Sequence, residues 1–411
     1  LHRVPARHDL QVQMEAYLRA AGLEGRSDRT PLFRTARRRR RELTERGLRQ
    51  DSTDVGDLGR RLDAGPVTLY CGFDPTADSL HIGNLQSIML LRRFQSAGHA
   101  PIALVGGATG MIGDPSGRSS ERQFLDTEVL DHNRSSIGAQ LGRFLDTGDA
   151  PNAARLVDNR SWTEELSVLD FLRDVGKHVT INTMLARDSV RSRMDRDTGI
   201  SYTEFSYMLL QAHDFLVLHR EMGCDLQVAG SDQWGNIAAG VDLVRRVTAD
   251  IVHGWTAPLI VRSDGTKFGK SEGENIWLSA ERTSPYRMYQ HLLNVADSDV
   301  ETLLLRLTTV PLDEIRRTVV LHEQNPASRE GQRRVATEIT TLVHGAAVAA
   351  QVQEASSVLF GQPLEGLDAP AFELLAAEVP TTRLAESDLL GAAAVDLLAA
   401  TGLAPSKGDV R

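Results

Sequence analysis

Two short polar motifs in this chain carry the side chains that a chain of phosphates needs. Residues 81–84 read His-Ile-Gly-Asn, and residues 267–271 read Lys-Phe-Gly-Lys-Ser. Together they offer an imidazole, an amide, two ammonium groups and glycines that leave backbone N–H groups accessible. Donors of this kind stabilise the negative charge that builds up on a triphosphate during attack at its α-phosphorus. The two motifs therefore predict a site for a nucleoside triphosphate.

The first motif follows a strand-like run, 66–73, and a polar turn that contains Thr76. At a helix N-terminus, the unpaired N–H groups and the helix dipole both favour phosphate. We expect His81 and Thr76 to donate hydrogen bonds to phosphate oxygens, and Gly83 to leave space for a flat adenine ring. A single histidine in a turn is usually a surface residue, so this motif alone is weak evidence.

The second motif lies in a loop punctuated by Gly265, Gly269 and Gly273. These glycines would let Lys267 and Lys270 close over pyrophosphate as charge develops. In isolation, a solvated charged hairpin is the simpler interpretation. The Walker-type spacing of a phosphate loop is absent, because Gly265 stands four residues before Gly269 and not five, which argues against an ordinary kinase or NTPase.

Composition places the chain among soluble globular proteins. Its 411 residues suggest two or three domains, and the apolar fraction of 41% and charged fraction of 25% are ordinary. A net charge of −9 argues against a cationic coat for nucleic acid but leaves room for a local basic face. Two cysteines, Cys71 and Cys224, predict no disulfide framework and hence a cytoplasmic protein. We see no membrane span and no signal peptide, and a start at Leu1 suggests a fragment or an odd gene model.

The elements around the first motif alternate as in a βαβ unit. Strands are expected at 66–73 and 101–107, with a helix between them that Asp78 or Ser79 caps and Gly98 ends. Its apolar positions recur at helical spacing: Leu85, Ile88, Met89 and Phe94. Such a unit predicts an α/β fold with a Rossmann-like parallel sheet, whose ligand lies at the carboxyl ends of the strands.

The same rhythm resumes later in the chain. Residues 120–200 are largely helical and polar, as an insertion would be, and a helix is expected near 203–222. A strand at 224–229 and a helix after Ser231 follow, and 258–263 predict one more strand before the lysine loop. The remainder is Ala/Leu-rich and helical.

Both motifs in this order, on an α/β framework with a helical insertion, resemble the class I aminoacyl-tRNA synthetases. The resemblance sharpens to the bacterial tyrosyl-tRNA synthetases through four further segments, namely 70–83, 106–117, 205–211 and 230–236. It extends from about residue 38 to residue 345. It implies that the chain activates L-tyrosine with ATP and transfers the tyrosyl group to the 3′ end of tRNA(Tyr).

The resemblance also implies which residues hold tyrosine. Tyr70 and Asp214 match the residues that hydrogen-bond the substrate phenol. A buried carboxylate there would be left unpaired by phenylalanine, which is how the tyrosine enzymes of this family discriminate. Asp214 also argues against the sister tryptophan enzyme. The residues that match those around the substrate's amino and carboxylate groups are Asp74, Asp114, Tyr207, Gln211 and Gln233.

On the nucleotide side, the resemblance gives catalytic roles to Thr76, His81, Lys267 and Lys270, which match groups that bind the triphosphate in the transition state. The full set that it implies for ATP is Cys71, Gly72, His81, Gly83, Asn84, Gly230, Asp232, Lys267, Lys270 and Ser271. Simpler interpretations remain for two positions: Cys71 as a small buried hydrophobe and Asp74 as a turn residue. Mg²⁺ is expected on the phosphates, with no metal bound tightly by the protein.

Three features depart from the family pattern. Asn84 stands where a second histidine is usual, so its own role is open. Phe-Gly replaces the Met-Ser of most class I lysine loops, as is typical of the tyrosine branch. The residues from Leu389 onward resemble the start of a small RNA-binding module, and we expect the chain to stop inside it.

We expect four segments along the chain. Residues 1–36 form an atypical extension that includes a scrap resembling a tyrosine recombinase. Residues 37–262 form the Rossmann-like catalytic domain. Residues 263–360 hold the lysine loop and an α-helical domain of the anticodon-binding type, and 361–411 hold a linker and the truncated module. The resemblance further implies a cytoplasmic homodimer that does not bind a membrane.

Two rival hypotheses come from other classes. A non-catalytic relative that binds structured RNA would keep the fold, but the intact His81, Lys270 and Asp214 argue against it. A recombinase-derived DNA-binding fusion would depend on 1–36, where the catalytic parts of such an enzyme are absent. Within the enzymes, activation of tryptophan is the alternative.

Overall fold

The computed structural model describes residues 41–114, 125–185, 190–191, 194, 199–263, 265–266, 268–271, 274–359, 361, 369–379, 381–402, 406 and 408–409. Residues 270 and 271 are described in their backbone alone. The expected extension at 1–36 and Lys267 of the second motif lie outside these residues.

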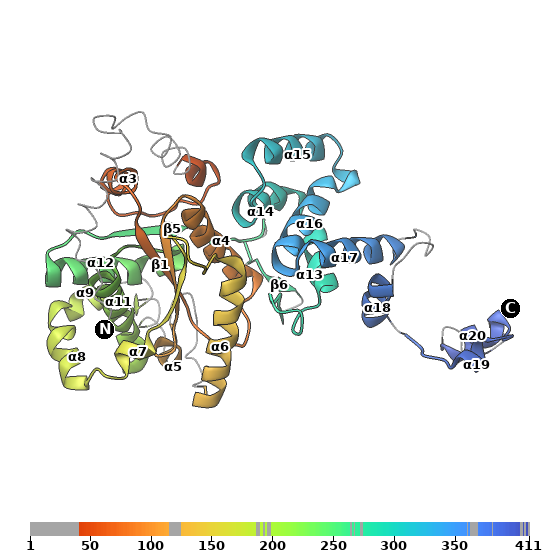
Figure 1. The fold of residues 1–411 in the computed structure, drawn as a ribbon, viewed down its shortest axis with the longest axis horizontal. Coiled ribbons are helices and arrows are strands. Elements are labelled where there is room, and N and C mark those ends of the chain that lie inside the picture. Colours follow the sequence, from red (N-terminus) through yellow and green to blue (C-terminus); the bar gives the residue numbers. More distant parts are fainter. Residues whose placement is uncertain are drawn as a thin grey trace. The chain divides into compact units, whose positions relative to one another are not determined.

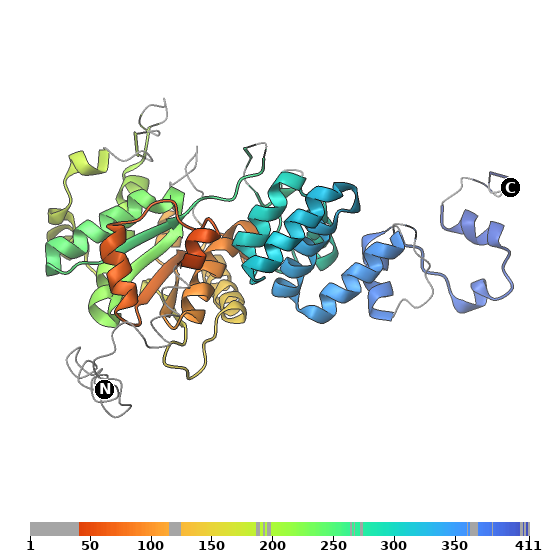
Figure 2. The ribbon, with the colours of Figure 1, turned by 90° about the horizontal axis from the view of Figure 1, so that it is seen from above.

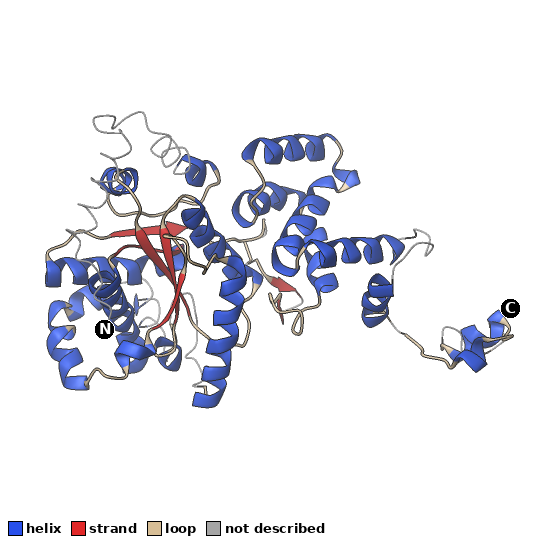
Figure 3. Cartoon of the chain, viewed as in Figure 1, coloured by secondary structure: helices blue, strands red, loops and turns tan. Residues whose placement is uncertain are grey.

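A parallel sheet of five strands forms the centre of the first part of the chain (Figures 1 and 3). Its spatial order is β3-β2-β1-β4-β5, and every neighbouring pair is parallel. The strands are β1 (Thr68–Phe73), β2 (Ala100–Val105), β3 (Arg155–Asp158), β4 (Cys224–Gly230) and β5 (His253–Ala257). From β1 the chain steps outward through β2 to β3, and then returns to the other side of β1 with β4 and β5. The point where the order reverses, between β1 and β4, is where such sheets bind ligands.

Helices cover both faces of this sheet, which explains why its central strands are almost continuously buried. The helices α11 (Tyr202–Met222) and α12 (Trp234–Thr248) lie on one side, and α4 (Ile82–Ser96) and α6 (Thr127–Phe144) lie on the other (Figure 1). A cluster of apolar side chains that includes Tyr70, Ile102 and Phe215 fills the space between β1, β2 and α11.

The predicted strands 66–73, 101–107 and 224–229 and the predicted helix 203–222 are confirmed. The predicted strand at 258–263 is wrong, because the fifth strand is β5, His253–Ala257, whose five residues are all buried beside β4. The apolar residues after it form a loop, in which the carbonyl of Ile260 accepts a hydrogen bond from Phe268 N–H at 3.1 Å. The polar insertion also contributes an edge strand, β3, that is too short and too exposed to show a pattern.

The start of α4 differs from the expected one. Its N-cap is His81, and not Asp78 or Ser79. His81 Nδ1 accepts from Gly83 N–H at 3.1 Å, and Asn84 Oδ1 accepts from His81 N–H at 3.1 Å. This reciprocal pair is a capping box, so the first motif is itself the helix start. Before β1 the chain forms helical residues 41–45 and α3 (Val55–Asp63).

The remaining elements of this part are short. They are α5 (Thr109–Ile112), α7 (Arg160–Thr163), α8 (Val168–Asp174), η1 (Gly176–His178), α9 (Ile181–Leu185), η2 (Ser231–Gln233), and the hairpin strands β6 (Lys270–Ser271) and β7 (Glu274–Asn275).

The chain divides into two compact units. The first unit contains the chain up to Ile276 and also Thr302–Leu312, so the lysine loop belongs to the same unit as the sheet. The expected boundary after residue 262 instead places this loop with the helical domain. The second comprises Trp277–Glu301 and the chain from Asp313 onward, and its described elements are all helical. They are α13 (Pro285–Leu293), η3 (Asp297–Asp299), α15 (Leu312–Gln324), η4 (Pro326–Ser328), α16 (Glu330–His344), α17 (Ala346–Leu359), α18 (Ala369–Glu378), α19 (Glu386–Leu389) and α20 (Ala394–Ala400), while α14 (Val300–Leu307) bridges the division.

The second unit has its own core, in which α16 packs against α13 and α17 (Figure 2). Met288, Leu292, Val335, Ile339 and Val352 are fully buried within it.

Candidate active site

Polar residues follow the carboxyl ends of the strands that flank the switch point. Asp74 follows β1, Gly106 follows β2, Asn159 follows β3 and Ser231 follows β4. Since parallel strands end at the same edge of a sheet, these residues converge there. They build the site together with side chains from α11.

A buried hydroxyl and a buried carboxylate form one end of the site. Tyr70 is 0% exposed, its ring packs edge-on against Phe215 at 5.3 Å, and its hydroxyl has no hydrogen-bond partner among the described residues. Burial, and then the negative charge of Asp214, raise the pKa of Tyr70 well above its usual value. Tyr70 is therefore a neutral donor without an acceptor, and a buried group in that condition signals a ligand.

Asp214 is held in place by two neutral donors. Asn159 Nδ2 donates to Asp214 Oδ2 at 2.9 Å, and Trp162 Nε1 donates to Asp214 Oδ1 at 2.9 Å. Burial raises the pKa of Asp214 to about 7, and these two hydrogen bonds oppose that rise. Beside Tyr70 this gives one donor and one acceptor in apolar surroundings, which is the complement of a phenol.

A second carboxylate, Asp74, is fixed at the end of β1. Its Oδ2 accepts from the Tyr207 hydroxyl at 3.0 Å and its Oδ1 accepts from Thr109 Oγ1 at 3.0 Å. Gly106 permits this approach, since a Cβ there would overlap both the Thr109 hydroxyl and the Asp74 carboxylate. A carboxylate held by neutral donors suits a substrate ammonium group.

A separate polar chain joins the loops after β2 and β4. Gln233 Nε2 donates to Asp114 Oδ2 at 2.6 Å, and Asn236 Nδ2 donates to Gln233 Oε1 and to Gln211 Oε1, both at 3.0 Å. The predicted residues Asp114, Gln211 and Gln233 are therefore brought together, with Asn236 as the link.

The two sequence motifs meet through their backbones. Gly269 has φ +103°, and a Cβ there would lie 2.9 Å from Ile82 Cγ2 and 3.3 Å from Gly83 N. The Ile82 N–H donates to the Ile276 carbonyl at 2.8 Å, and the Ile276 N–H donates to the Gly269 carbonyl at 2.9 Å. Only glycine at 269 allows so close a contact, so the lysine loop is seated on the start of α4.

The capping bond also fixes which ring nitrogen of neutral His81 carries the proton. Because Nδ1 accepts from Gly83 N–H, the neutral ring carries its proton on Nε2 and can donate from there. A Cβ at Gly83 would lie 2.8 Å from His81 Cε1, so glycine at this position also leaves space for the imidazole ring. The lysine loop forms a short hairpin in which Lys270 pairs with Asn275.

Further residues of the expected ATP set lie in or directly after β1 and β4. Cys71 is buried, and burial raises the pKa of its thiol to about 12. Asp232 is exposed, and a Cβ at Gly230 would lie 2.8 Å from its Oδ1. Gly72 and Thr76 are exposed, and a Cβ at Gly72 would come no closer to a neighbouring atom than 3.9 Å, to Leu104. The surface beside Gly72 is thus open to a ligand.

Four site residues were not predicted: Thr109, Asn159, Trp162 and Asn236. Asn159 and Trp162 follow β3, the strand that showed no pattern. Had β3 been recognised, the rule that polar residues after parallel strands build sites would have pointed to Asn159. Nothing in the sequence pattern singled out Asn236.

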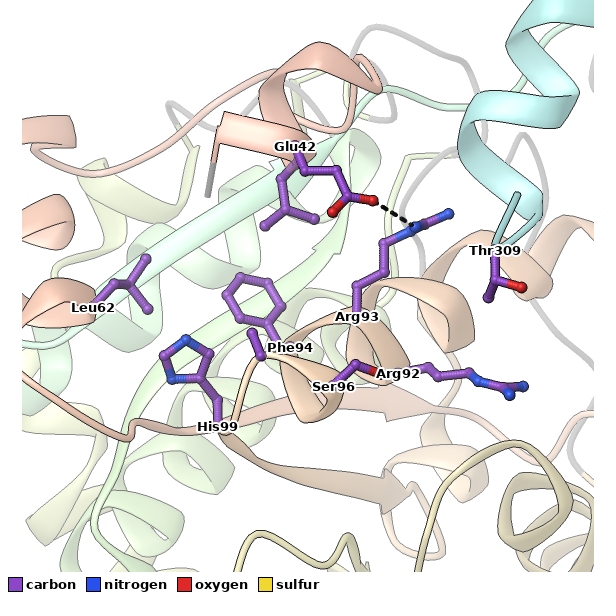
Figure 4. A pocket seen from close by; sticks show the side chains of 10 residues that line it. Glu42, Leu62, Arg92, Arg93, Phe94, Ser96, His99 and Thr309 are labelled. Carbon is purple, nitrogen blue, oxygen red and sulfur yellow. Dashed lines mark ion pairs between the residues drawn. The ribbon is translucent and has the colours of Figure 1, made fainter. Parts of the chain in front are cut away.

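A hollow elsewhere in the first unit does not belong to this site (Figure 4). It is lined by Leu62 and His99, which precede β1 and β2, so it lies at the opposite edge of the sheet. Next to it, Arg46 donates to the carbonyl oxygens of Val310 at 2.7 Å and Leu305 at 3.2 Å. Arg93, whose side chain is 10% exposed, also donates to the Leu305 carbonyl at 3.3 Å, and burial lowers its pKa to about 9. The arginines beside this hollow thus attach 302–312 to the sheet.

Comparisons with known proteins agree with this geometry. The family described as tRNA synthetases class I (W and Y) matches residues 62–361. The chain is 53% identical to a tyrosine–tRNA ligase of Opitutus terrae over 90% of this chain and 88% of the relative, and 49% identical to one of Roseiflexus castenholzii over 90% and 87%. The crystal structure of a C-terminally truncated mitochondrial tyrosyl-tRNA synthetase of Aspergillus nidulans superposes with a TM-score of 0.72 at 31% identity, covering 80% of this chain and 98% of that one.

The raised pKa of Asp214 makes a prediction about stability. Its value of about 7 in the folded protein lies above the ordinary 3.8, so the folded state binds this proton more readily and stability falls as pH rises from about 4 to about 7. Asp214→Asn has no such proton. Between pH 4 and pH 7 the wild type should therefore lose up to about 4 kcal/mol of unfolding free energy that this variant does not lose.

Urea unfolding at several pH values between these limits measures the difference. Asp313→Asn, on the exposed face of α15, is the matched control and should follow the wild-type profile. Parallel profiles for Asp214→Asn and the wild type would contradict the prediction.

Proposed function

The chain belongs to the class I tRNA synthetase family, among the tyrosine–tRNA ligases. From that premise we propose which of its residues bind tyrosine and which act on ATP. The reaction joins tyrosine to ATP as tyrosyl-adenylate, with release of pyrophosphate, and then transfers tyrosine to the 3′ end of tRNA(Tyr). The observation that carries the assignment is the buried Tyr70 hydroxyl without a partner beside the buried Asp214.

These two residues select the phenol. Tyr70 donates a hydrogen bond to the phenolic oxygen, and Asp214 accepts a hydrogen bond from the phenolic hydroxyl. Phenylalanine would leave the Tyr70 hydroxyl unpaired and would withhold from Asp214 the hydrogen bond of the phenol; an unpaired buried group costs about 1–3 kcal/mol. The opposite end of tyrosine lies among Asp74, Asp114, Tyr207 and Gln211, which receive the ammonium group, and Gln233, which lies near the carboxylate.

The chemical step needs positioning and charge stabilisation. The tyrosine carboxylate is already ionised, so it attacks the α-phosphorus in line without a general base and without a covalent enzyme intermediate. Thr76, His81, Lys267 and Lys270 stabilise the charge that develops on the phosphates. Cys71, Gly72, Gly230 and Asp232 hold the ribose side, with Gly83, Asn84 and Ser271 completing the ATP site.

Mg²⁺ is a further part of this proposal. The triphosphate oxygens would carry Mg²⁺, which would offset their negative charge.

The decisive experiment is ATP–pyrophosphate exchange with each of the twenty amino acids. We expect exchange with tyrosine and at least about a hundredfold less with phenylalanine or tryptophan, because each leaves the buried donor and acceptor unpaired. An inactive chain that binds tRNA would support the rival, a non-catalytic RNA-binding relative.

His81 provides the sharpest test of the phosphate roles. In His81→Asn the cap of α4 is kept, because Asn is a good N-cap, but the Nε2–H donor is lost. We expect the exchange rate to fall by about 10²–10³-fold with little change in the KM for tyrosine. A normal rate in a folded His81→Asn protein, checked by thermal unfolding, would refute the assignment.

We also propose a homodimer, formed through an apolar patch on the insertion. The patch consists of Val168, Leu169 and Leu172 on α8, Ile181 on α9 and Tyr202 at the start of α11, whose exposed fractions are 74%, 77%, 47%, 59% and 74%. Large apolar side chains gathered in this way mark a protein interface. A second copy of the chain is the occupant that the family resemblance implies.

Leu169→Glu tests this interface. A charge in the patch should weaken dimerisation at least about tenfold, since burying it costs more than 1.4 kcal/mol. Sedimentation velocity would then show monomer where the wild type shows dimer. Val320→Glu replaces another exposed apolar residue, 51% exposed on α15, and is the control that should leave the dimer intact. Dimer formation by Leu169→Glu with wild-type affinity would contradict the proposed patch.

Three further assignments belong to the same proposal. The second, helical unit binds the anticodon region of tRNA(Tyr). The protein works in the cytoplasm; within the part of the chain described here, none of the helices combines the length and apolar character needed to cross a membrane. The recombinase-like scrap in 1–36 is a passenger.

A further inference from the structure

Thr109 lies between the two buried ends of the site, and we propose that it is a positioning residue that couples recognition of the substrate ammonium to recognition of the phenol. The inference rests on the proposed function, since it concerns the same tyrosine pocket. Thr109 begins α5, after β2, and its hydroxyl is hydrogen-bonded to the Asp74 carboxylate and to the Asn159 amide.

The direction of each hydrogen bond follows from one backbone group. Ala108 N–H donates to Asn159 Oδ1 at 2.8 Å, which fixes the orientation of the Asn159 amide. Its Nδ2 is therefore the donor, both to Asp214 Oδ2 at 2.9 Å and to Thr109 Oγ1 at 3.0 Å. Because the Thr109 oxygen accepts from Asn159, its own proton is available for Asp74 Oδ1 at 3.0 Å.

The result is one directed chain from the phenol end to the ammonium end. Asn159 is 0% exposed, Thr109 is 4% exposed and Asp214 is 2% exposed, so water does not compete for these bonds. In such low-dielectric surroundings linked hydrogen bonds strengthen one another. Two neighbouring glycines enforce the geometry, because a Cβ at Gly106 would overlap Thr109 and Asp74, and one at Gly107 would overlap Asp158.

Loss of the Thr109 hydroxyl would therefore disturb both ends at once. Asp74 would lose the Thr109 donor, and a buried Asn159 N–H would lose its acceptor. Asn159 could then recover a partner only by moving away from Asp214. A residue that merely filled space, or that served Asp74 alone, would not alter the selection of the phenol.

The experiment compares Thr109→Val, which keeps the shape but not the hydroxyl, with Thr109→Ser, which keeps the hydroxyl. Two tyrosine analogues compete in tyrosine-dependent ATP–pyrophosphate exchange: 3-(4-hydroxyphenyl)propanoate lacks the amino group, and L-phenylalanine lacks the hydroxyl. The inhibition constant of each, divided by the KM for tyrosine, measures how strongly the enzyme reads the missing group.

In Thr109→Val both ratios should fall by about tenfold, or about 1.4 kcal/mol, because Asp74 loses a donor at one end and Asn159 loses an acceptor at the other. Thr109→Ser should keep both ratios within about threefold of the wild type, as the retained hydroxyl makes the same bonds.

A fall in the ammonium ratio alone, or in neither ratio, would overturn the proposal. A fall in both ratios for Thr109→Ser would do so as well, since shape and not the hydroxyl would then matter. Thr109→Ala gives the same readouts if Thr109→Val does not fold. Absence of tyrosine-dependent exchange in the wild type would instead defeat the proposed function, so the two failures are distinguishable.

Discussion

Burial of the Asp214 carboxylate is the constraint on which the rest of the pocket depends. An ionised group almost removed from water is costly unless neutral donors surround it, and here Asn159 and Trp162 supply them. These two donors occupy one side of the carboxylate, while the adjacent Tyr70 hydroxyl has no described partner. The Tyr70 hydroxyl, a donor, and the Asp214 carboxylate, an acceptor, are therefore not hydrogen-bonded to each other. A phenol satisfies both, which explains why the site suits tyrosine and not a plain aromatic ring.

A second constraint is the contact between the two phosphate-side motifs. They are far apart in sequence, yet the backbone of Gly269 lies against Ile82 and Gly83. The hydrogen bonds through Ile276 hold this contact. Because Gly269 and Ile276 contact the N-terminus of α4, the backbones of the two motifs lie together at the start of that helix. Glycine is needed at 269 for two reasons: its φ is positive, and a Cβ would overlap Ile82.

The helix α4 also connects this site to the rest of the first unit. Its first residues form the capping box of His81 and Asn84, and near its last turn Arg93 reaches the carbonyl of Leu305, which Arg46 also contacts. Each of these arginines is buried against backbone carbonyl oxygens, so the charges are solvated by the protein in place of water. Asn84, whose role the sequence left open, supplies half of the cap. The substitution of Asn for the usual histidine thus keeps a structural function.

By itself the sequence determined the class of fold, the family and most of the chemistry, because βαβ periodicity and the spacing of polar motifs are local properties. It predicted roles for Tyr70, Asp214 and His81; the structure shows the first two buried and the third at the start of α4. It placed the fifth strand at 258–263 in place of His253–Ala257, because apolar content alone does not show which residues pair with β4. It gave no sign of β3, of the cap at His81, or of Thr109 and Asn159. Those features arise from contacts between residues distant in sequence, and only the tertiary structure could bring their hydrogen-bonding groups within reach of one another.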